Sequence, residues 1–355
     1  MSLPPVEIPL GAMRFNSDSQ KLEYWNGSAW FQIHTFSPNL DGGARGLVMG
    51  GNSPGAPNSG RLNNIEYVTI SSAGNSQDFG DLTSVGRSST GSCASATRGL
   101  AMGGFDESAP AYRDIIDFVT ISSTGNATDF GNLTINRQPC CSFSNATRGC
   151  CAGGYAIAPL ISPNQNMTTI DYVTIASEGN AVDFGDMTVA FRSRDSLQSP
   201  TRGIMAGGYS SVGSESKVID FVTIATTGNA QDFGDIGSKF TSYAQNGYGN
   251  ATRGVFPLCD SNDSGNYVCD TLDFITLSTL GNPTEYGDLT TSRAIACSFS
   301  NPTRGILVAG ASPDSDDIDY NNIATGGTSV DFGEYSAYSV LKAASGCSNA
   351  HGGLG

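Results

Sequence analysis

Residues 124–134, TGNATDFGNLT, contain the tripeptide Asp129-Phe130-Gly131. Asp-Phe-Gly is the magnesium-binding signature of protein kinases, where it works with a catalytic loop, a lysine and a Gly-rich phosphate loop. No such partners stand at suitable positions here. A catalytic motif is needed once, whereas this one recurs, so we interpret it as a structural element. The other copies are Asp78-Phe79-Gly80, Asp183-Phe184-Gly185, Asp232-Phe233-Gly234, Glu285-Tyr286-Gly287 and Asp331-Phe332-Gly333.

The remaining reactive side chains give little support for catalysis. The two histidines, His34 and His351, stand near no Ser or Cys constellation in the sequence, and no G-x-S-x-G elbow is present. Acids are abundant enough for the paired carboxylates of a glycosidase, but almost all of them belong to the repeats. The Asp-box pattern of propeller sialidases is also absent. We therefore expect a non-enzymatic protein without a cofactor.

Metal binding has weak support in the sequence. The segments 260–266 and 312–317 are rich enough in carboxylates to bind calcium, so that alternative stays open, but both lack the EF-hand spacing and its closing Glu. Adjacent cysteines at 140–141 and 150–151 are not CxxC ligand pairs, so zinc is not expected. The cysteines ahead of the repeated turn are predicted to be small buried thiols, whereas Cys259 and Cys269 could form a bridge. The predicted buried thiols are Cys93, Cys141, Cys297 and Cys347.

Composition and charge limit the possible partners. The chain has 355 residues, of which 45 are Gly and only 14% are charged, and its formal net charge is −15. Such an acidic chain is a poor candidate for binding a phosphate backbone, so no nucleic-acid partner is expected. No apolar run approaches the roughly 18–20 residues of a membrane span, and the first ten residues do not resemble a secretion signal.

Internal repeats dominate the sequence from residue 37 onward. An Arg-Gly turn, usually Thr-Arg-Gly, recurs about every 50 residues, followed by an apolar run, a variable loop, a stretch such as IDFVTI (116–121) and a Gly-Asn turn. β-Branched and aromatic residues favour strands, and Gly-Asn supplies the positive φ of tight turns. Four short strands per repeat predict an all-β, kelch-like β-propeller over residues 37–355. The degenerate copy at 345–355 predicts that the C-terminal strand completes the first of six blades, with seven blades as the alternative.

The arginine of the repeated turn has two interpretations. One is a ring of anion-binding guanidinium groups. The other, which we favour, is a structural ion pair within or between blades, because bidentate Arg–carboxylate pairs suit repetition. The expected partners are the acids of the IDF strand. The residues concerned are Arg98, Arg148, Arg202, Arg253, Arg304, Asp117, Asp171, Asp220 and Asp273, with Arg45 and Asp319 as further copies.

Loops after the Gly-Gly strand differ most between repeats, and they should all emerge on one face of the propeller. They carry Tyr112, Tyr155, Tyr209 and Tyr267 among Asn, Ser and Asp. Exposed loops on a rigid scaffold are where binding usually resides. Tyrosine suits polyhydroxylated ligands because it offers an apolar ring face and a hydrogen-bonding edge. We predict a ligand-binding face at these four residues.

The N-terminal segment stands apart from the repeats. It predicts three strands at 12–16, 21–25 and 29–33, with Asn26-Gly27 as a type I′ hairpin signal. A meander this small cannot bury a core by itself. We therefore predict that residues 1–36 form an attachment or oligomerisation element, with Phe15, Trp25 and Trp30 at its interface.

Two stretches resemble known families. The stretch GAMRFN…LEYWNGSAW resembles a short β-element near the ends of bacteriophage tail-fibre and other virion proteins. The repeat IDFVTISSTGNATDFGNLT (116–134), with its Arg-Gly turn, resembles repeats in structural proteins of marine phages, notably those that infect cyanobacteria. Repeats 5 and 6 depart from this pattern at GVFPLCD and IDYNNI, which predicts distortion there. The resemblance implies a virion protein that is assembled in the host bacterial cytoplasm and exposed on the particle.

Three functions remain open at this point. The first is a tail fibre or tail-associated host-recognition protein that binds a cell-surface glycan or protein, with other virion proteins as partners and a homotrimer as one possible assembly. The second is a capsid or neck decoration without host contact. The third is a glycan-degrading propeller, although fold alone says nothing of chemistry.

Overall fold

The computed structural model describes residues 8–16, 21–32, 44–84, 86–106, 111–138, 140–157, 165–209, 215–237, 240–241, 247–261 and 267–354. The chain divides into two compact units, Met1–Leu40 and Asp41–Gly355. The predicted boundary between residues 36 and 37 lies outside the described residues. Each unit is treated by itself below.

The smaller unit is a three-stranded antiparallel meander. Its strands are β1 (Met13–Asn16), β2 (Lys21–Trp25) and β3 (Trp30–Gln32), which confirms the three predicted strands to within a residue. The predicted type I′ turn is wrong, since Trp25 pairs with Trp30 and leaves a four-residue loop. The Asn26 side chain accepts hydrogen bonds from the backbone N–H groups of Ser28 and Ala29, and this favours the longer loop.

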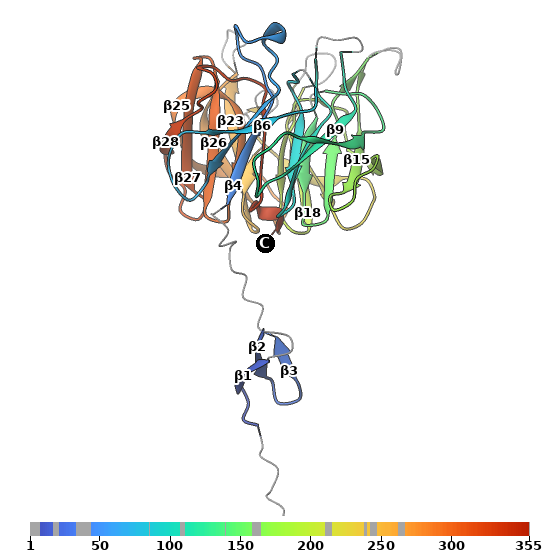
Figure 1. Ribbon diagram of the computed structural model, residues 1–355, viewed down its shortest axis with the longest axis vertical. Coiled ribbons are helices and arrows are strands. Elements are labelled where there is room, and N and C mark those ends of the chain that lie inside the picture. Colours follow the sequence, from blue (N-terminus) through green and yellow to red (C-terminus); the bar gives the residue numbers. More distant parts are fainter. Residues whose placement is uncertain are drawn as a thin grey trace, which may run out of the picture. The chain divides into compact units, whose positions relative to one another are not determined.

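The larger unit is built from antiparallel sheets, mostly four-stranded, with one sheet per repeat at its N-terminal end (Figure 1). The first sheet has the order β29-β4-β5-β6, with β29 (Ser345–Ser348), β4 (Arg45–Met49), β5 (Asn64–Thr69) and β6 (Gln77–Asp81). The second contains β7 (Gly91–Ala94), β8 (Arg98–Met102), β9 (Ile115–Thr120) and β10 (Thr128–Asn132). The third contains β11 (Cys141–Ser144), β12 (Arg148–Ala152), β15 (Thr169–Thr174) and β16 (Val182–Asp186). The fourth contains β17 (Asp195–Gln198), β18 (Arg202–Ala206), β19 (Val218–Thr223) and β20 (Gln231–Asp235).

Repeats 5 and 6 form one continuous eight-stranded sheet, because β25 (Thr284–Ser300) serves both as the last strand of repeat 5 and as the first strand of repeat 6. This is the distortion that the altered repeats predicted. The other strands of the sheet are β21 (Phe240–Thr241), β22 (Tyr248–Gly249), β23 (Arg253–Ser261), β24 (Tyr267–Thr276), β26 (Arg304–Ala311), β27 (Ser315–Asn322) and β28 (Val330–Glu334). A two-stranded ribbon, β13 (Tyr155–Ala156) with β14 (Gln165–Asn166), and the 3₁₀ turns η1 (Asn58–Gly60) and η2 (Gly352–Leu354) complete the elements.

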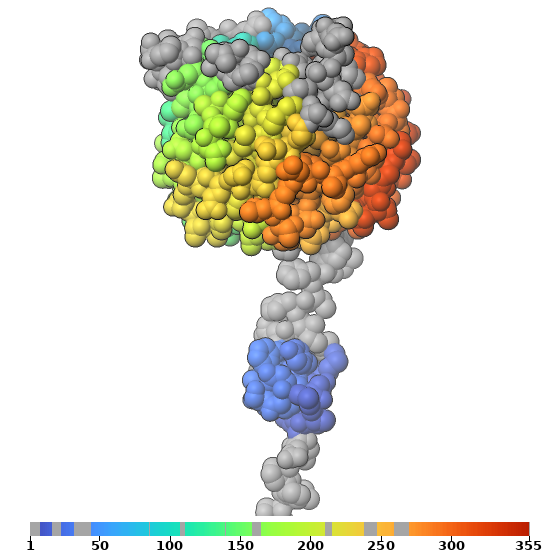
Figure 2. Space-filling model, turned by 180° about the vertical axis from the view of Figure 1, so that it is seen from behind, coloured from blue at the N-terminus to red at the C-terminus, as the bar shows by residue number. Residues whose placement is uncertain are grey.

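The innermost strands contact one another in a closed cycle, β29 to β7, β11, β17, β22, β25 and back to β29. Consecutive segments therefore follow one another around the surface, as the colour order in Figure 2 shows. The C-terminal strand β29 pairs with β4, the pairing that the degenerate final copy predicted. Because strands alternate in direction, the variable loops emerge on one face, named here the loop face. Strand β4 begins, and the chain ends, on the opposite face (Figure 1).

The glycine of the repeated Arg-Gly turn is required by packing between sheets. A Cβ on Gly203 would overlap the ring of Phe143 in the preceding inner strand, and a Cβ on Gly149 would lie 2.7 Å from the Cys93 sulfur. The same relation holds around the cycle, up to Gly46 against Phe299. Because protein interiors are close-packed, only glycine lets the sheets approach this closely.

The Asp-Phe-Gly tripeptide is also structural. Phe79 is buried and its ring packs edge-on against Tyr67 at 6.0 Å, whereas Asp78 is exposed within strand β6. Gly80 lies against the Gly-Asn turn of the next repeat, and the backbone N–H of Gly125 in that turn donates to the Phe79 carbonyl at 2.7 Å. The Asp-Phe-Gly copies are thus structural, as the sequence analysis interpreted them. Their acidic residues place charge on an outer strand, which discourages edge-to-edge association.

Candidate functional site

Three aromatic rings and two guanidinium groups form a continuous stacked row on the loop face, named here the aromatic strip. Arg61 lies 4.8 Å above the Phe105 ring, and Phe105 packs edge-on against Tyr112 at 5.7 Å. Tyr112 packs edge-on against Tyr155 at 6.2 Å, and Arg192 lies 4.7 Å above the Tyr155 ring. The strip therefore connects the loops and linkers of the first four repeats.

The scaffold holds the centre of the strip in place. Phe105 and Tyr112 are paired by a β-bridge across their loop. The neighbouring residues, Asp106 and Arg113, form a bidentate ion pair with distances of 2.6 and 2.9 Å. The Asn136 side chain also donates to the Tyr112 carbonyl at 3.0 Å. A platform fixed at both ends of its loop loses little conformational entropy when a ligand binds.

The strip offers polar groups that the protein itself does not use. All five strip residues are partly exposed. Within the described part of the chain, the hydroxyl groups of Tyr112 and Tyr155 and the guanidinium group of Arg192 have no hydrogen-bond partner or ion pair. Ring edges and faces beside unused donors and acceptors are what recognition of a polyhydroxylated ligand requires.

Two of the four predicted tyrosines, Tyr112 and Tyr155, thus come together in one row. Tyr209 is buried, and its backbone exchanges two hydrogen bonds with Arg192, so it fixes the backbone position of Arg192. Tyr267 begins β24, and its side chain lies outside the described residues. Sequence reasoning missed Phe105, although it directly follows Gly-Gly, as do Tyr155 and Tyr209. The shared position was a signal that could have identified it.

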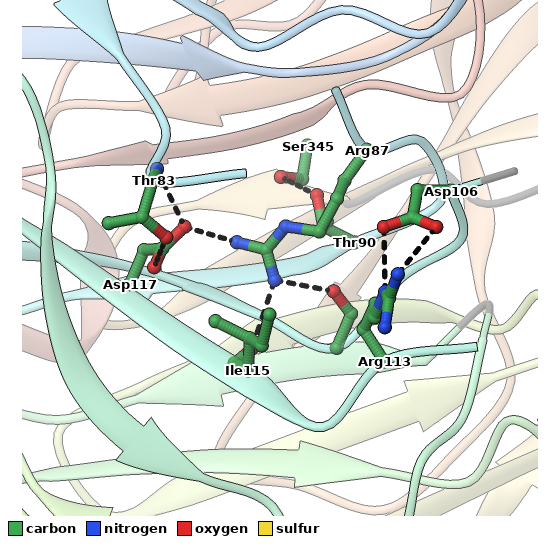
Figure 3. A network of polar contacts seen from close by, with 9 residues as sticks. Thr83, Arg87, Thr90, Asp106, Arg113, Ile115, Asp117 and Ser345 are labelled. Carbon is green, nitrogen blue, oxygen red and sulfur yellow. Dashed lines mark hydrogen bonds and ion pairs between the residues drawn. The ribbon is translucent and has the colours of Figure 1, made fainter. Parts of the chain in front are cut away.

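Buried ion pairs hold the segment that leads into a repeat against the acid of that repeat, through arginines that the sequence analysis had not singled out. Arg87, from the linker ahead of β7, donates to Asp117 of β9 and to the Ile115 carbonyl (Figure 3). The distance to Asp117 is 2.5 Å, and Arg87 also donates to the Gly103 carbonyl. Thr83 donates its hydroxyl to the same Asp117 carboxylate at 2.5 Å. The equivalent pairs are Arg137–Asp171, Arg194–Asp220 and Arg293–Asp319.

The predicted pairing of the turn arginines with these acids is therefore wrong. Each turn arginine instead stacks on an aromatic ring of its own repeat and donates to a backbone carbonyl of the next repeat. Arg98, for example, lies 4.5 Å above Phe118 and donates to the Ile175 carbonyl at 3.1 Å. The other donations run from Arg45 to Ile121, Arg148 to Ile224, Arg202 to Leu277, Arg253 to Ile323 and Arg304 to Ile70. The last one joins repeat 6 to repeat 1, so the turn arginines close the cycle.

The centre of the cycle holds a Ser–His contact that cannot act as a catalytic pair. His351 Nε2 lies 3.2 Å from the Ser144 hydroxyl, a contact that the sequence analysis did not expect. The N–H of Gly353 donates to Nδ1, so the neutral ring carries its proton on Nε2, which donates to the Ala94 carbonyl at 2.7 Å. Burial lowers the pKa of His351 to about 4. The nitrogen that faces Ser144, Nε2, therefore has no lone pair with which to accept the serine proton, and the Ser144 hydroxyl itself donates to the Ala94 carbonyl.

The central cavity is also too small for a sugar. Its volume is about 20 Å³, and it is lined by serine side chains of the inner strands, such as Ser92 and Ser142, with His351 at its end. This is room for about one water molecule. Among the described residues, no group of three or more His, Cys, Asp or Glu could hold a metal ion. The predicted thiols are all free and buried, whereas the side chains of Cys259 and Cys269 lie outside the described residues.

The smaller unit has a second candidate surface. Alternation along the strands places Met13, Phe15, Tyr24 and Phe31 on one face of the meander, where their exposed fractions are 60, 65, 40 and 47%. The tryptophans lie on the other face, with ring centroids 5.5 Å apart. Arg14 covers Trp30 at 4.3 Å, so one predicted interface residue, Phe15, is freely available, whereas the tryptophans are partly covered.

Comparisons with known proteins inform the fold. No protein-family model matches the chain, and no curated protein matches it. Among solved structures, the chain is similar to one described as the structure of YjhT, with a TM-score of 0.57 and 8% identity over 75% of this chain and 91% of that chain. Together with the closed cycle of antiparallel sheets, this likeness shows a β-propeller-like fold. No helix in the described ranges is long and apolar enough to cross a membrane.

Proposed function

We propose that this protein is a non-enzymatic bacteriophage virion protein, a tail fibre or tail-associated protein that binds a glycan on the host surface. In this proposal the larger unit is a kelch-like propeller of six blades, with the eight-stranded sheet counted as two. The observation that carries the binding role is the aromatic strip, because its tyrosine hydroxyls and one guanidinium group have no partner within the described protein. The virion role rests on the resemblance of residues 11–33 and of the repeats to phage proteins.

The arrangement of the larger unit supports this role. The loop face lies opposite the face on which β4, the first strand of the unit, begins. A propeller tethered through its N-terminal side would therefore present the strip outward. The apolar face of the meander, which includes Met13 and Phe15, supports burial against virion proteins or against other copies of the chain, for example in a trimer.

Binding of the purified, fluorescently labelled protein to host cells, with competition against phage adsorption, tests this function. We expect saturable binding that blocks adsorption and that the double substitution Tyr112→Ala and Tyr155→Ala abolishes. The matched control is Leu280→Ala, since Leu280 is a 60% exposed apolar side chain at a Gly-Asn turn, away from the loop face. Absence of cell binding by a protein that is present on particles would refute host recognition and favour a capsid or neck decoration.

The attachment role of the smaller unit has its own test. Deletion of residues 1–36 is expected to abolish incorporation into particles and to leave the larger unit folded, because the two units are separately compact. The substitutions Met13→Ser and Phe15→Ser, which remove exposed apolar area from the meander, should have the same effect. Particles that carry the truncated protein at the normal level would show that attachment occurs elsewhere.

A further inference from the structure

Arg192 differs from every other arginine of the chain in what its side chain contacts. All fourteen arginines lie in described segments. The six arginines of the repeated turns donate to backbone carbonyls, Arg14 and Arg113 pair with acids, and Arg61 donates to the Ser59 carbonyl. Four more bind buried aspartates, namely Arg87, Arg137, Arg194 and Arg293. Arg192 alone has a guanidinium group that makes no hydrogen bond or ion pair with the described protein.

Arg192 is nevertheless held in position. The backbone N–H of Arg192 donates to the Tyr209 carbonyl at 3.0 Å, and the backbone carbonyl of Arg192 accepts from the Tyr209 N–H at 2.8 Å. Its guanidinium group lies 4.7 Å above the Tyr155 ring. Stacking on an aromatic face uses the face of the guanidinium plane and leaves the N–H groups at its edge directed outward. The group is thus preorganised and has unused donors.

These donors specify the chemistry of the ligand. A guanidinium edge matches the two oxygens of a carboxylate, because two parallel N–H···O bonds form at once. The adjacent hydroxyl groups of Tyr155 and Tyr112 suit sugar hydroxyls. A sugar that carries a carboxylate would use both features of the strip.

We propose that Arg192 binds the carboxylate of an acidic sugar, so that the glycan taken by the aromatic strip is a uronic-acid polysaccharide. This inference rests on the proposed glycan binding and adds the ligand class to it. The net charge of −15 excludes general attraction of polyanions by the protein. Selection for the acidic sugar therefore depends on the local Arg192 contact.

The test uses matched polysaccharides, namely polygalacturonate and alginate, each beside its carboxyl-reduced neutral form, with a sulfated galactan and its desulfated form as a third pair. Retention of the full-length protein on each immobilised polymer is measured. We expect the two carboxylated polymers to bind about tenfold or more tightly than their reduced forms, the range for a charge-assisted hydrogen-bonded pair. Preference within the sulfated pair alone, with none within the carboxylated pairs, would overturn the carboxylate assignment.

Three variants assign the preference to Arg192. Arg192→Gln should remove the preference for the carboxylated form and leave binding of the reduced form unchanged, whereas Arg192→Lys, which keeps the charge but loses the fork, should retain part of it. Lys342→Gln is the control, because Lys342 is a cation paired with Asp314 outside the strip. An Arg192→Gln variant with an unchanged preference, or no binding of any panel member, would overturn the inference. If the panel result is negative but the protein still binds host cells through Tyr112 and Tyr155, the proposed function stands. If the protein does not bind host cells at all, the proposed function is refuted as well.

Discussion

Replacement of Arg87 by leucine tests how the sheets are held together. Arg87 and Asp117 are both almost completely buried, with side-chain exposed fractions of 0 and 1%. Burial lowers the pKa of Arg87 and the neighbouring Asp117 carboxylate opposes that effect. Arg87→Leu leaves the Asp117 carboxylate with Thr83 as its hydrogen-bond donor. It removes the side-chain donor of the Gly103 carbonyl and leaves the Ile115 carbonyl with the backbone N–H of Gly103 alone.

The expected loss is about 3–5 kcal/mol in the free energy of unfolding, the range for removing one partner of a buried ion pair. Asp117→Asn should cost a comparable amount, because it leaves a buried guanidinium group. The double variant should lose less than the sum of the two single losses, since neither charge is then left alone. Urea unfolding followed by far-UV circular dichroism measures this cycle. Tryptophan fluorescence would not, because Trp25 and Trp30 both lie in the smaller unit.

The control is Lys342→Leu, which removes an ion pair whose side chains are 37 and 52% exposed and should change stability by no more than about 1 kcal/mol. Single losses of Arg87→Leu and Asp117→Asn below that level would refute the view that the linker arginines hold the sheets. Strict additivity of the two losses would refute their coupling.

Three further outcomes are expected. Asp195 is fully buried, neither of its carboxylate oxygens has a hydrogen-bond partner among the described residues, and burial raises its pKa well above the usual value. Folding stability should therefore fall as pH rises above about 4. Asp195→Ser should raise the free energy of unfolding by about 1–3 kcal/mol at pH 7 and flatten this pH dependence in urea titrations. Burial lowers the pKa of His351 to about 4, so its contribution to folding stability is complete above about pH 6.5 and is lost as pH falls to 4. NMR titration in a His34→Ala background should give a pKa near 4 for His351. A pKa near 6.5 would contradict its burial. Gly203→Ala should cost about 1–3 kcal/mol by overlap with Phe143, and Phe143→Leu should recover part of that loss; a neutral Gly203→Ala would show that the sheets can separate freely.

The strands and the closure of the cycle could be predicted from the sequence because the same pattern of strands and turns recurs in each repeat. Segments such as Ile116–Ile121 combine β-branched and aromatic residues, and the Gly-Asn turns fix where the next strand begins. The degenerate copy at 345–355 identified β29 as the partner of β4. Copies within one chain supply the comparison that a single sequence otherwise lacks.

The arginine contacts could not be predicted in the same way, for a geometric reason. Asp117 pairs across the sheet with Ala101, three residues beyond Arg98, which is about 10 Å along a strand. The turn arginine therefore lies at the wrong end of the strand to reach the acid of its own sheet. The arginines that do reach these acids stand at varying distances after the Asp-Leu-Thr type segment, for example Arg87 and Arg194. Alignment of the repeats by fixed spacing hides them.

The seam between repeats 6 and 1 shows how far this scaffold tolerates change. Leu341 stands at the position of Arg87, and the acid is Glu66, which accepts from the Ser76 hydroxyl and has its pKa raised by burial. The turn contact from Arg304 to the Ile70 carbonyl is kept there. A seam can thus lose its ion pair but keeps its Arg-Gly turn, so the turn residues are fixed by packing.

The residue after Gly-Gly, in contrast to the Arg-Gly turn, is not fixed by packing between repeats. Asn52, Phe105, Tyr155 and Tyr209 occupy the same bridge position in four repeats, and each forms a backbone β-bridge to an adjacent linker. Backbone bridging holds the residue in place whatever its side chain, so this position can vary without loss of the fold. Aromatic residues there lie at the edge of the closed cycle, within reach of linker residues such as Arg192. A ligand-binding surface can therefore form at these positions at little cost to closure, and the aromatic strip lies there.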